Sequence, residues 1–223
     1  MSAEDLLNAI DSDDAAAVET LLEAHPDLAL IRDDDGVSVV LHALYRGRRA
    51  VAEQVAAVIG DLDVFDAAAL ARAGRVRALV AVDPAFVTAR SADGFTALHY
   101  PAFFGGDDAA ETAQALIDAG AEVNARSEND FSVLPIHSAV AGGHDAVVAV
   151  LIDAGADINA RQRHGWTSLH GAAQNGSLAS VARLLAAGAD PAARNDDGTK
   201  AADLARAGGH DEIADRLIAD RHG

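Results

Sequence analysis

Hydrophobic positions recur along this chain with two superimposed periods. Within short segments they lie three and four residues apart, as in Val181, Leu184 and Leu185, which is the pattern of an apolar helix face. Over longer distances the same residue type returns every 33 positions, as in Leu151, Leu184 and Leu217. A fixed period of this length is typical of stacked, repeated supersecondary units. The pattern therefore predicts an extended helical solenoid in which each unit packs on its neighbours.

The clearest unit runs from His164 to Asp196 and contains two predicted helices. Thr167 is suited to cap the first helix by accepting a backbone N–H. Gly176 is suited to the left-handed turn that ends this helix. Gly188 ends the second helix, and an extended hairpin follows it. The unit therefore reads as helix, turn, helix and hairpin.

This unit resembles the ankyrin repeat. The segment Thr167-Ser168-Leu169-His170-Gly171-Ala172 is similar to the family signature Thr-Pro-Leu-His-x-Ala, with Ser168 in place of proline. Further matches to the signature or to the end of the repeat lie at residues 93–99, 120–125, 134–137, 143–144, 155–160 and 187–190. The resemblance, to bacterial-type members, implies an all-α fold: an ankyrin-repeat α-solenoid of helix-turn-helix units joined by β-hairpin-like loops.

We expect one ankyrin-repeat domain over residues 1–223 with about seven units, the first three of them degenerate. Their approximate bounds are 1–34, 35–60, 61–92, 93–130, 131–163, 164–196 and 197–223. Equivalent positions near the start of each first helix are Glu4, Ser38, Leu62, Thr96, Leu134, Thr167 and Lys200. The steps between them are 34, 24, 34, 38, 33 and 33 residues.

The 24-residue step falls between units two and three. About nine residues are missing there relative to the 33-residue period, which is enough to delete a hairpin. The segment Gly60-Asp61-Leu62-Asp63 then predicts a tight helix–helix link, with Asp61 or Asp63 as the cap of the next helix.

The 38-residue step belongs to unit four. Gly105 and Gly106 precede its second helix, and residues 127–130 lengthen its exit loop. Pro101 lies in its first helix, where proline removes a backbone hydrogen bond and bends the axis. We therefore expect unit four to be visibly distorted.

The chain carries a formal net charge of −18 and no cysteine. Without thiols it cannot form disulfides or cysteine-based zinc sites. The charge disfavours binding to nucleic acid and to anionic membranes, because both are polyanions. Residues 1–63 hold fourteen acidic residues and four arginines, so the acid is concentrated at the N-terminal end. This charge fits a basic protein partner, or a surface that only keeps the protein soluble.

The N-terminal segment Met1 to Ile10 contains Glu4 and Asp5 and lacks the basic region and apolar run of a signal peptide. No apolar stretch approaches the roughly 20 residues that a membrane span requires. We therefore expect a soluble, cytoplasmic monomer with no cofactor.

Three histidines, His99, His137 and His170, occupy one position of successive units. Helices of neighbouring units pack about 8–10 Å apart, whereas zinc ligands must converge within about 2 Å of one ion. This row therefore cannot be a metal site. We expect each histidine to form hydrogen bonds near its own helix start and to the neighbouring hairpin.

A second row consists of arginines that follow the second helices: Arg32, Arg90, Arg126, Arg161 and Arg194. One interpretation is a solvated ladder of weak ion pairs with nearby acids. The other is a strip that binds carboxylates of a partner, because guanidinium pairs with them in a bidentate manner.

The aromatic residues give the clearest candidate for a binding surface. By resemblance, the hairpin tips and first helices line the concave groove in which ankyrin stacks bind partners. Large aromatics and arginines are typical of interface hot spots. The predicted partner-binding residues are Phe95, Tyr100, Phe103, Phe104, Phe131, Arg161, Arg163, Trp166, Gln174 and Asn175. The competing interpretation is that Phe103 or Phe131 fills space around the irregular unit four.

No catalytic pattern is present, so no catalytic residue is predicted. The chain lacks the nucleophile elbow, the phosphate-binding loop and the zinc-peptidase motif. An enclosed cluster of perturbed ionisable groups would be the sign of an enzyme. We expect instead a non-enzymatic protein–protein interaction scaffold or adaptor that binds through its concave groove. The alternative is an acidic decoy or inhibitor of a basic, nucleic-acid-binding protein, acting through residues 1–63.

Overall fold

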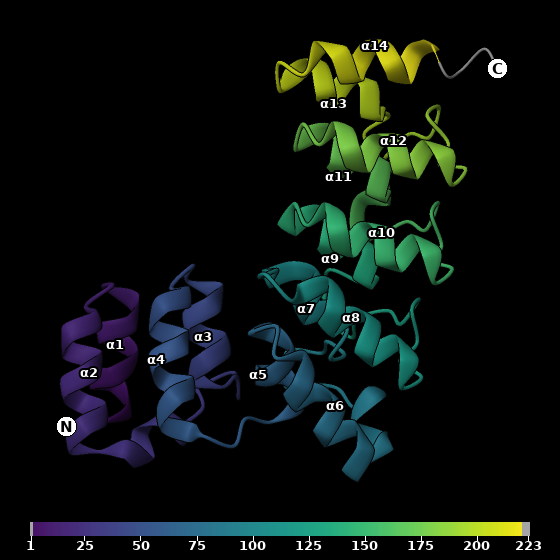
Figure 1. Ribbon diagram of the computed structural model, residues 1–223. Helices are drawn as coiled ribbons and strands as arrows, with labels where there is room; N and C mark the ends of the chain where they lie inside the picture. Colours follow the sequence, from purple (N-terminus) through teal and green to yellow (C-terminus); the bar gives the residue numbers. More distant parts are fainter. Residues whose placement is uncertain (1, 220–223) are drawn as a thin grey trace.

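The computed structural model describes residues 2–219, whose α-helices form seven consecutive pairs, numbered one to seven here (Figure 1). The pairs are α1 (Ala3–Asp11) with α2 (Ala15–Ala24), α3 (Val39–Tyr45) with α4 (Arg49–Ile59), α5 (Val64–Ala69) with α6 (Ala73–Val82), α7 (His99–Phe104) with α8 (Ala109–Asp118), α9 (Pro135–Gly142) with α10 (Asp145–Asp153), α11 (Ser168–Gln174) with α12 (Leu178–Ala186), and α13 (Ala201–Ala207) with α14 (Asp211–Ala219). Short 3₁₀ turns lie at Pro26–Leu30, Pro84–Val87 and Arg163–Gly165. The expected all-α solenoid is confirmed, while the residue at which each repeat begins stays a prediction.

The turn inside each pair contains at least one residue with positive φ. The first such residues are Asp13, Gly47, Ala71, Gly105, Gly143, Gly176 and Gly209, and Gly106 is a second one in pair four. The first residues of the seven turns are separated by the same 34, 24, 34, 38, 33 and 33 residues as the aligned helix starts in the sequence. The 24-residue step lies in the loop between α4 and α5, whereas the 38-residue step also includes a longer turn inside pair four, between Phe104 and Ala109. Equivalent residues can be compared by counting back from these turns.

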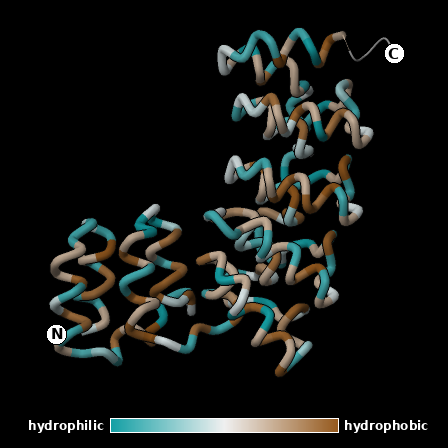
Figure 2. Tube along the Cα trace, viewed as in Figure 1, coloured by the Kyte–Doolittle hydropathy of each residue, from teal (hydrophilic) through white to brown (hydrophobic). Residues whose placement is uncertain are grey.

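The core is one continuous layer that runs from Leu6 to Leu217. Alanine supplies much of it, which lets neighbouring helices approach closely. In Figure 2 the hydrophobic stretches lie along the faces where helices meet, and hydrophilic residues are concentrated in the turns. Stability is therefore spread over many small contacts between successive pairs.

The solenoid is sharply bent (Figure 1). Helices α1 to α4 form one arm, α7 to α14 form a second, straighter arm, and α5 and α6 connect them. The bend coincides with the 24-residue step, because α4 ends at Ile59 and α5 begins at Val64 with no hairpin between them. Asp63 caps α5 by accepting the backbone N–H groups of Phe65 and Asp66. Of the two residues that the sequence offered as this cap, Asp61 and Asp63, the structure therefore selects Asp63.

The second helices of the pairs form the outer layer of the solenoid, and this layer is interrupted at the bend. Helix α2 packs on α4, and α6 packs on α8, but α4 and α6 flank a cavity of about 680 Å³. Small residues such as Ala56 and Gly74 line it. An ion pair between Glu53 and Arg72 crosses from α4 to α6. The curvature therefore opens the outer face and closes the inner one.

The distortion expected at Pro101 takes a milder form than a mid-helix bend. Pro101 is the third residue of α7, in the first turn, where backbone N–H groups lack intrahelical partners. The helix is entered through tighter i→i+3 bonds, from His99 N–H to the Thr96 carbonyl and from Tyr100 N–H to the Ala97 carbonyl. The proline therefore shortens the start of α7.

Pair seven has a polar outer face on α14. Exposed charged residues on α14 are Asp211, Glu212, Asp215 and Arg216. The carboxylate of Asp203 accepts the Lys200 N–H at the position of the signature histidine. None of the helices in residues 2–219 has the length and apolar character of a membrane span.

Candidate partner-binding surface

Helix pairs two and four touch each other across pair three, and we call this region the joint. Tyr45 is the last residue of α3, and its hydroxyl donates to the Asp93 carboxylate at 2.6 Å. The Arg49 guanidinium donates to the carbonyls of Phe104 and Gly105 at 2.9 and 3.0 Å. Stacked repeats ordinarily contact only their immediate neighbours. These contacts therefore hold the bend closed on its inner side.

An aromatic patch, formed by Tyr45, Phe103 and Phe104, lies where the two arms meet. The ring centroids of Tyr45 and Phe104 are 5.0 Å apart, those of Phe103 and Phe104 are 5.2 Å apart, and those of Tyr45 and Phe103 are 6.3 Å apart. Counted back from the turns, Tyr45 and Phe103 flank the equivalent Ala69 of pair three, which is fully buried. The small alanine lets the two larger side chains close over it.

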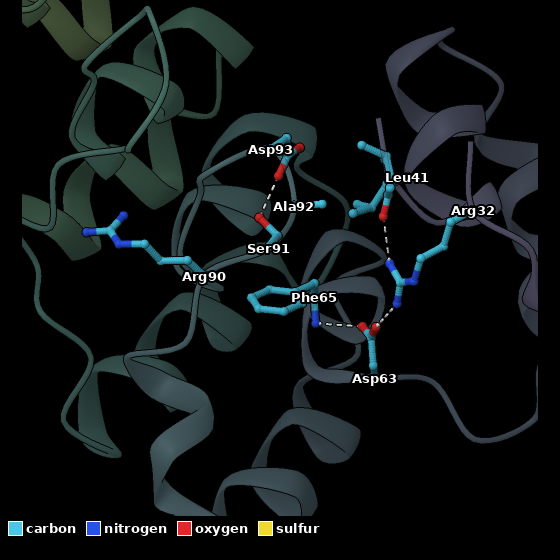
Figure 3. Close-up of a pocket in the computed structure, with 10 residues that line it drawn as sticks. Arg32, Leu41, Asp63, Phe65, Arg90, Ser91, Ala92 and Asp93 are labelled. Carbon is cyan, nitrogen blue, oxygen red and sulfur yellow. Dashed lines mark hydrogen bonds and ion pairs between the residues drawn. The ribbon is translucent and has the colours of Figure 1, made fainter. Parts of the chain in front are cut away.

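A cavity of about 350 Å³, which we call the notch, lies on the hairpin side of the joint (Figure 3). One wall is the hairpin tip of pair two and the other is residues 90–93 before pair four. Leu41, Asp63 and Phe65 lie between these walls. The notch occupies the place where the missing hairpin of pair three would lie. Nothing in the sequence analysis anticipated it.

Leu41 and Phe65 occupy the positions that hold the signature histidine in pairs four to six, six residues before the turn. In those pairs the histidine donates to a carbonyl of the following loop. Pair three has no hairpin to supply that carbonyl for pair two, so an apolar Leu41 there leaves no unpaired imidazole. The missing histidines, together with the 24-residue step, are the signal that could have revealed the notch.

Asp93 connects the notch to the aromatic patch. Its carboxylate accepts the hydroxyls of Tyr45 at 2.6 Å, Tyr100 at 2.7 Å and Ser91 at 2.5 Å. Burial and the adjacent Asp93 charge raise the pKa of both tyrosines. Both therefore remain hydrogen-bond donors at neutral pH and are unsuited to acid–base chemistry.

Asp66 is the other perturbed group of the joint. It lies in α5, is 5% exposed and accepts the Ser38 hydroxyl at 2.5 Å. Burial, reinforced by the nearby Asp63 carboxylate, raises the pKa of Asp66 to about 7. A carboxyl group therefore titrates near neutral pH inside the contact between α3 and α5.

The predicted aromatic residues differ widely in exposure. Phe131 and Phe103 are 62% and 42% exposed, so neither fills space around pair four. Phe95, Phe104 and Trp166 are half-buried. Tyr100 is only 1% exposed, because its ring packs between Phe65, Phe95 and Phe104. Its predicted contact with a partner is therefore wrong, and its role is to hold Asp93.

Phe95 and Trp166 each cover the signature histidine of their own pair. The ring centroid of Phe95 lies 5.2 Å from that of His99, and that of Trp166 lies 5.9 Å from that of His170. Part of each ring therefore serves the core, and the remaining face is available to a partner.

The four predicted polar residues, Arg161, Arg163, Gln174 and Asn175, are all exposed. Two of them already have protein contacts. Arg161 pairs with Asp196 at 3.2 Å, and the Asn175 side-chain amide donates to the Val140 carbonyl at 2.8 Å. Partner contact by any of the four stays a prediction.

The histidine row has the structural role expected from the sequence. Each Nδ1 accepts a backbone N–H at the start of its own helix, and each Nε2–H donates to a carbonyl of the next loop, at Val133 for His99, Ala160 for His137 and Thr199 for His170. Burial lowers the pKa of His99 and of His137 to about 4, and it also lowers the pKa of His170. These imidazoles are therefore neutral links between repeats.

The arginine row has a role that the sequence analysis missed. Several of these guanidinium groups donate to a carbonyl of their own hairpin turn, as Arg32 does to Gly36, Arg90 to Gly94, Arg126 to Ser132 and Arg194 to Gly198. The arginines therefore brace the hairpins, and partner binding by them is untested.

The structure and the comparisons with known proteins agree on the family. Residues 111–195 and 136–223 match the family model of ankyrin repeats in three copies, and residues 93–128 match that of the single ankyrin repeat. No curated protein matches the chain in sequence. The matched residues include pairs four to seven, of which pairs four to six carry the signature histidine described above. The chain belongs to the ankyrin repeat family.

Proposed function

We propose that this protein is a monomeric, cytoplasmic, non-enzymatic scaffold that binds a partner protein on its inner face at the joint. Ankyrin repeats generally mediate protein–protein interactions. The observation that carries the proposal is the exposure of Tyr45 and Phe103. Both are 42% exposed and lie in mutual contact where the two arms meet.

Aromatic side chains on a rigid surface are effective anchors for a partner, because little side-chain entropy is lost when they are covered. The half-buried Phe104 ring packs against Phe103, and Arg49 holds the backbone of this segment through the Phe104 carbonyl. Phe131, on the exit loop of pair four, is a further exposed ring, and its carbonyl accepts the Arg163 N–H. Trp166 and Arg163 extend this surface toward pair six.

Affinity capture from the native host, quantified by mass spectrometry, tests the proposal. The bait variant combines Phe103→Ala with Phe131→Ala, and we expect it to lose the partner that wild type retains. The matched control is Val82→Ala, which removes an exposed apolar side chain from α6, an outer helix. Equal recovery of the partner by wild type and the double variant would show that the aromatic surface is not the binding centre.

The decoy alternative places binding on the carboxylates of residues 1–63. Several of these already have side-chain partners: Asp11 pairs with Arg46 and lies within hydrogen-bond distance of His42, and Asp13 pairs with Arg48. Repeating the capture over a range of salt concentrations separates the two functions. Binding that weakens steeply with salt and survives loss of both phenylalanines favours the decoy.

A further inference from the structure

We propose that the notch receives an arginine side chain of the partner protein, so that the partner carries a basic segment next to the apolar residues that cover the aromatic patch. This inference rests on the proposed function and specifies the chemistry of the partner.

The notch has the size and lining of a site for one long side chain. Its volume of about 350 Å³ is at the lower end of the range for small ligand sites, which is about 300–1,000 Å³. Leu41 and Phe65 give it an apolar base that suits the methylene groups of an arginine. The Phe65 ring, which Figure 3 shows at the centre of the lining residues, also suits a planar cation.

The two arginines that line the notch already have anionic partners. Arg32 pairs with Asp63 at 3.3 Å. Arg90 pairs with Glu128 at 2.8 Å, and its guanidinium points away from Phe65 in Figure 3. Neither therefore offers a free positive charge to an anionic ligand.

The remaining charge of the notch is negative. Within residues 2–219, Asp93 accepts three hydroxyl hydrogen bonds but has no ion pair with a cationic side chain. Asp34 and Asp35, on the opposite hairpin tip, are both exposed. An anion would face these carboxylates, and a purely apolar group would leave Asp93 without a counter-charge. A cation is therefore the ligand that this site favours.

The notch and the aromatic patch are adjacent, because the Tyr45 hydroxyl of the patch donates to Asp93 in the wall of the notch. A partner segment that covers Tyr45 therefore has Asp93 within reach of a neighbouring residue. Arginine suits this position better than lysine, because its planar guanidinium can stack on Phe65 and pair with a carboxylate at the same time.

The tripeptide acetyl-Arg-Arg-Arg-amide serves as the probe, titrated into ¹⁵N-labelled protein and followed by NMR. We expect chemical-shift changes concentrated at Gly36, Phe65 and residues 91–94. Asp93→Asn should weaken binding about tenfold, because it keeps an oxygen that accepts hydroxyl groups but removes the charge. The matched control is Asp197→Asn, the equivalent exposed hairpin aspartate of pair seven, which should bind as wild type does.

A second variant covers the case in which Asp93→Asn disturbs the joint. Phe65→Leu keeps an apolar base but removes the ring, and it should weaken the arginine probe about threefold. The tripeptide acetyl-Lys-Lys-Lys-amide controls for charge alone, and we expect it to bind more weakly than the arginine probe.

Two results would overturn the inference. One is equal binding of the lysine and arginine probes, with shifts spread over the acidic surface. The other is unchanged probe binding in both Asp93→Asn and Phe65→Leu. Failure of the proposed function is distinguishable, because Phe103→Ala tests the aromatic patch separately: capture that depends on Phe103 but not on Asp93 retains the proposed function and rejects the notch.

Discussion

The regular stack, from α9 to α14, and the joint, from α3 to α8, hold successive helix pairs together with different chemistry. In the regular stack a buried histidine of one pair donates to the next loop, as His137 does to the Ala160 carbonyl. In the joint, pairs two and four reach past pair three through Tyr45 and Arg49. The hairpin of an ankyrin repeat is thus both a spacer and a hydrogen-bond partner. Where it is missing, the chain bends, and a cavity forms.

The largest expected effect comes from breaking one link of the regular stack. His137→Ala removes two buried hydrogen bonds and leaves the Leu134 N–H and the Ala160 carbonyl without that partner. We expect a loss of about 2–4 kcal/mol in the free energy of unfolding. Urea denaturation measures it, with the exposed His25→Ala as the matched control. Equal stability of the two variants would show that His137 does not stabilise the stack.

In the joint, a substitution that removes a buried charge should stabilise the fold. The Asp66 pKa is raised, to about 7, so its ionisation destabilises the fold as pH rises from about 4 through 7. Asp66→Asn keeps an acceptor for Ser38 and should raise the free energy of unfolding at pH 8 by about 1–3 kcal/mol. A decrease at pH 8 would contradict the burial argument.

Acidification should change the free energy of unfolding through both the buried histidines and Asp66. His99 and His137 have pKa values lowered to about 4. Their contribution to stability is complete above about 6.5, the pKa of an unfolded histidine, and is lost as pH falls toward 4. In wild type this loss is partly offset by protonation of Asp66. Urea denaturation from pH 8 to pH 4.5 should therefore show a steeper decline in Asp66→Asn than in wild type.

Arg49→Ala tests the bridge between the arms. It removes the hydrogen bonds to the carbonyls of Phe104 and Gly105, and we expect a loss of about 1–2 kcal/mol in the free energy of unfolding. Small-angle X-ray scattering should also show a larger radius of gyration, because the arms are less firmly held. Arg163→Ala, an exposed arginine of the second arm, should change neither quantity. An unchanged radius in Arg49→Ala would show that the bend does not depend on this bridge.

Tyr45→Phe should have the smallest effect. It deletes one hydroxyl hydrogen bond to Asp93, which retains those of Tyr100 and Ser91. We expect a loss of about 1 kcal/mol in the free energy of unfolding by urea denaturation, with the aromatic patch preserved. A loss as large as that of His137→Ala would make this hydroxyl a principal support of the joint.

Most of the fold could be predicted from the sequence, because the repeat period fixes both the helix positions and their stacking order. The short link from Gly60 to Asp63 was also predictable, since nine residues are missing there. The aromatic residues of pair four could be recognised as a group, but not their separate exposures. Tyr100 and Phe103 are three residues apart on a short helix, but Tyr100 is buried by residues of other segments, such as Phe65, while Phe103 is exposed.

The joint itself could not be predicted, because it depends on contacts between residues far apart in the sequence. Tyr45 and Asp93 are 48 positions apart and belong to pairs that are not neighbours. The repeat period implies contacts between adjacent pairs only, so a contact between pairs two and four leaves no trace in it. The notch follows from the same geometry, since its walls come from hairpins on either side of a missing one.

We infer that the missing hairpin causes the bend. This causal role is tested most directly by pulsed electron paramagnetic resonance between spin labels on Ala16→Cys in α2 and Ala186→Cys in α12, both exposed, in a chain with no other cysteine. The comparison is with a variant in which a nine-residue hairpin follows Gly60, which restores the 33-residue step. We predict one narrow distance in the labelled chain and a clearly longer distance in the insertion variant. The same distance in both would contradict the claim.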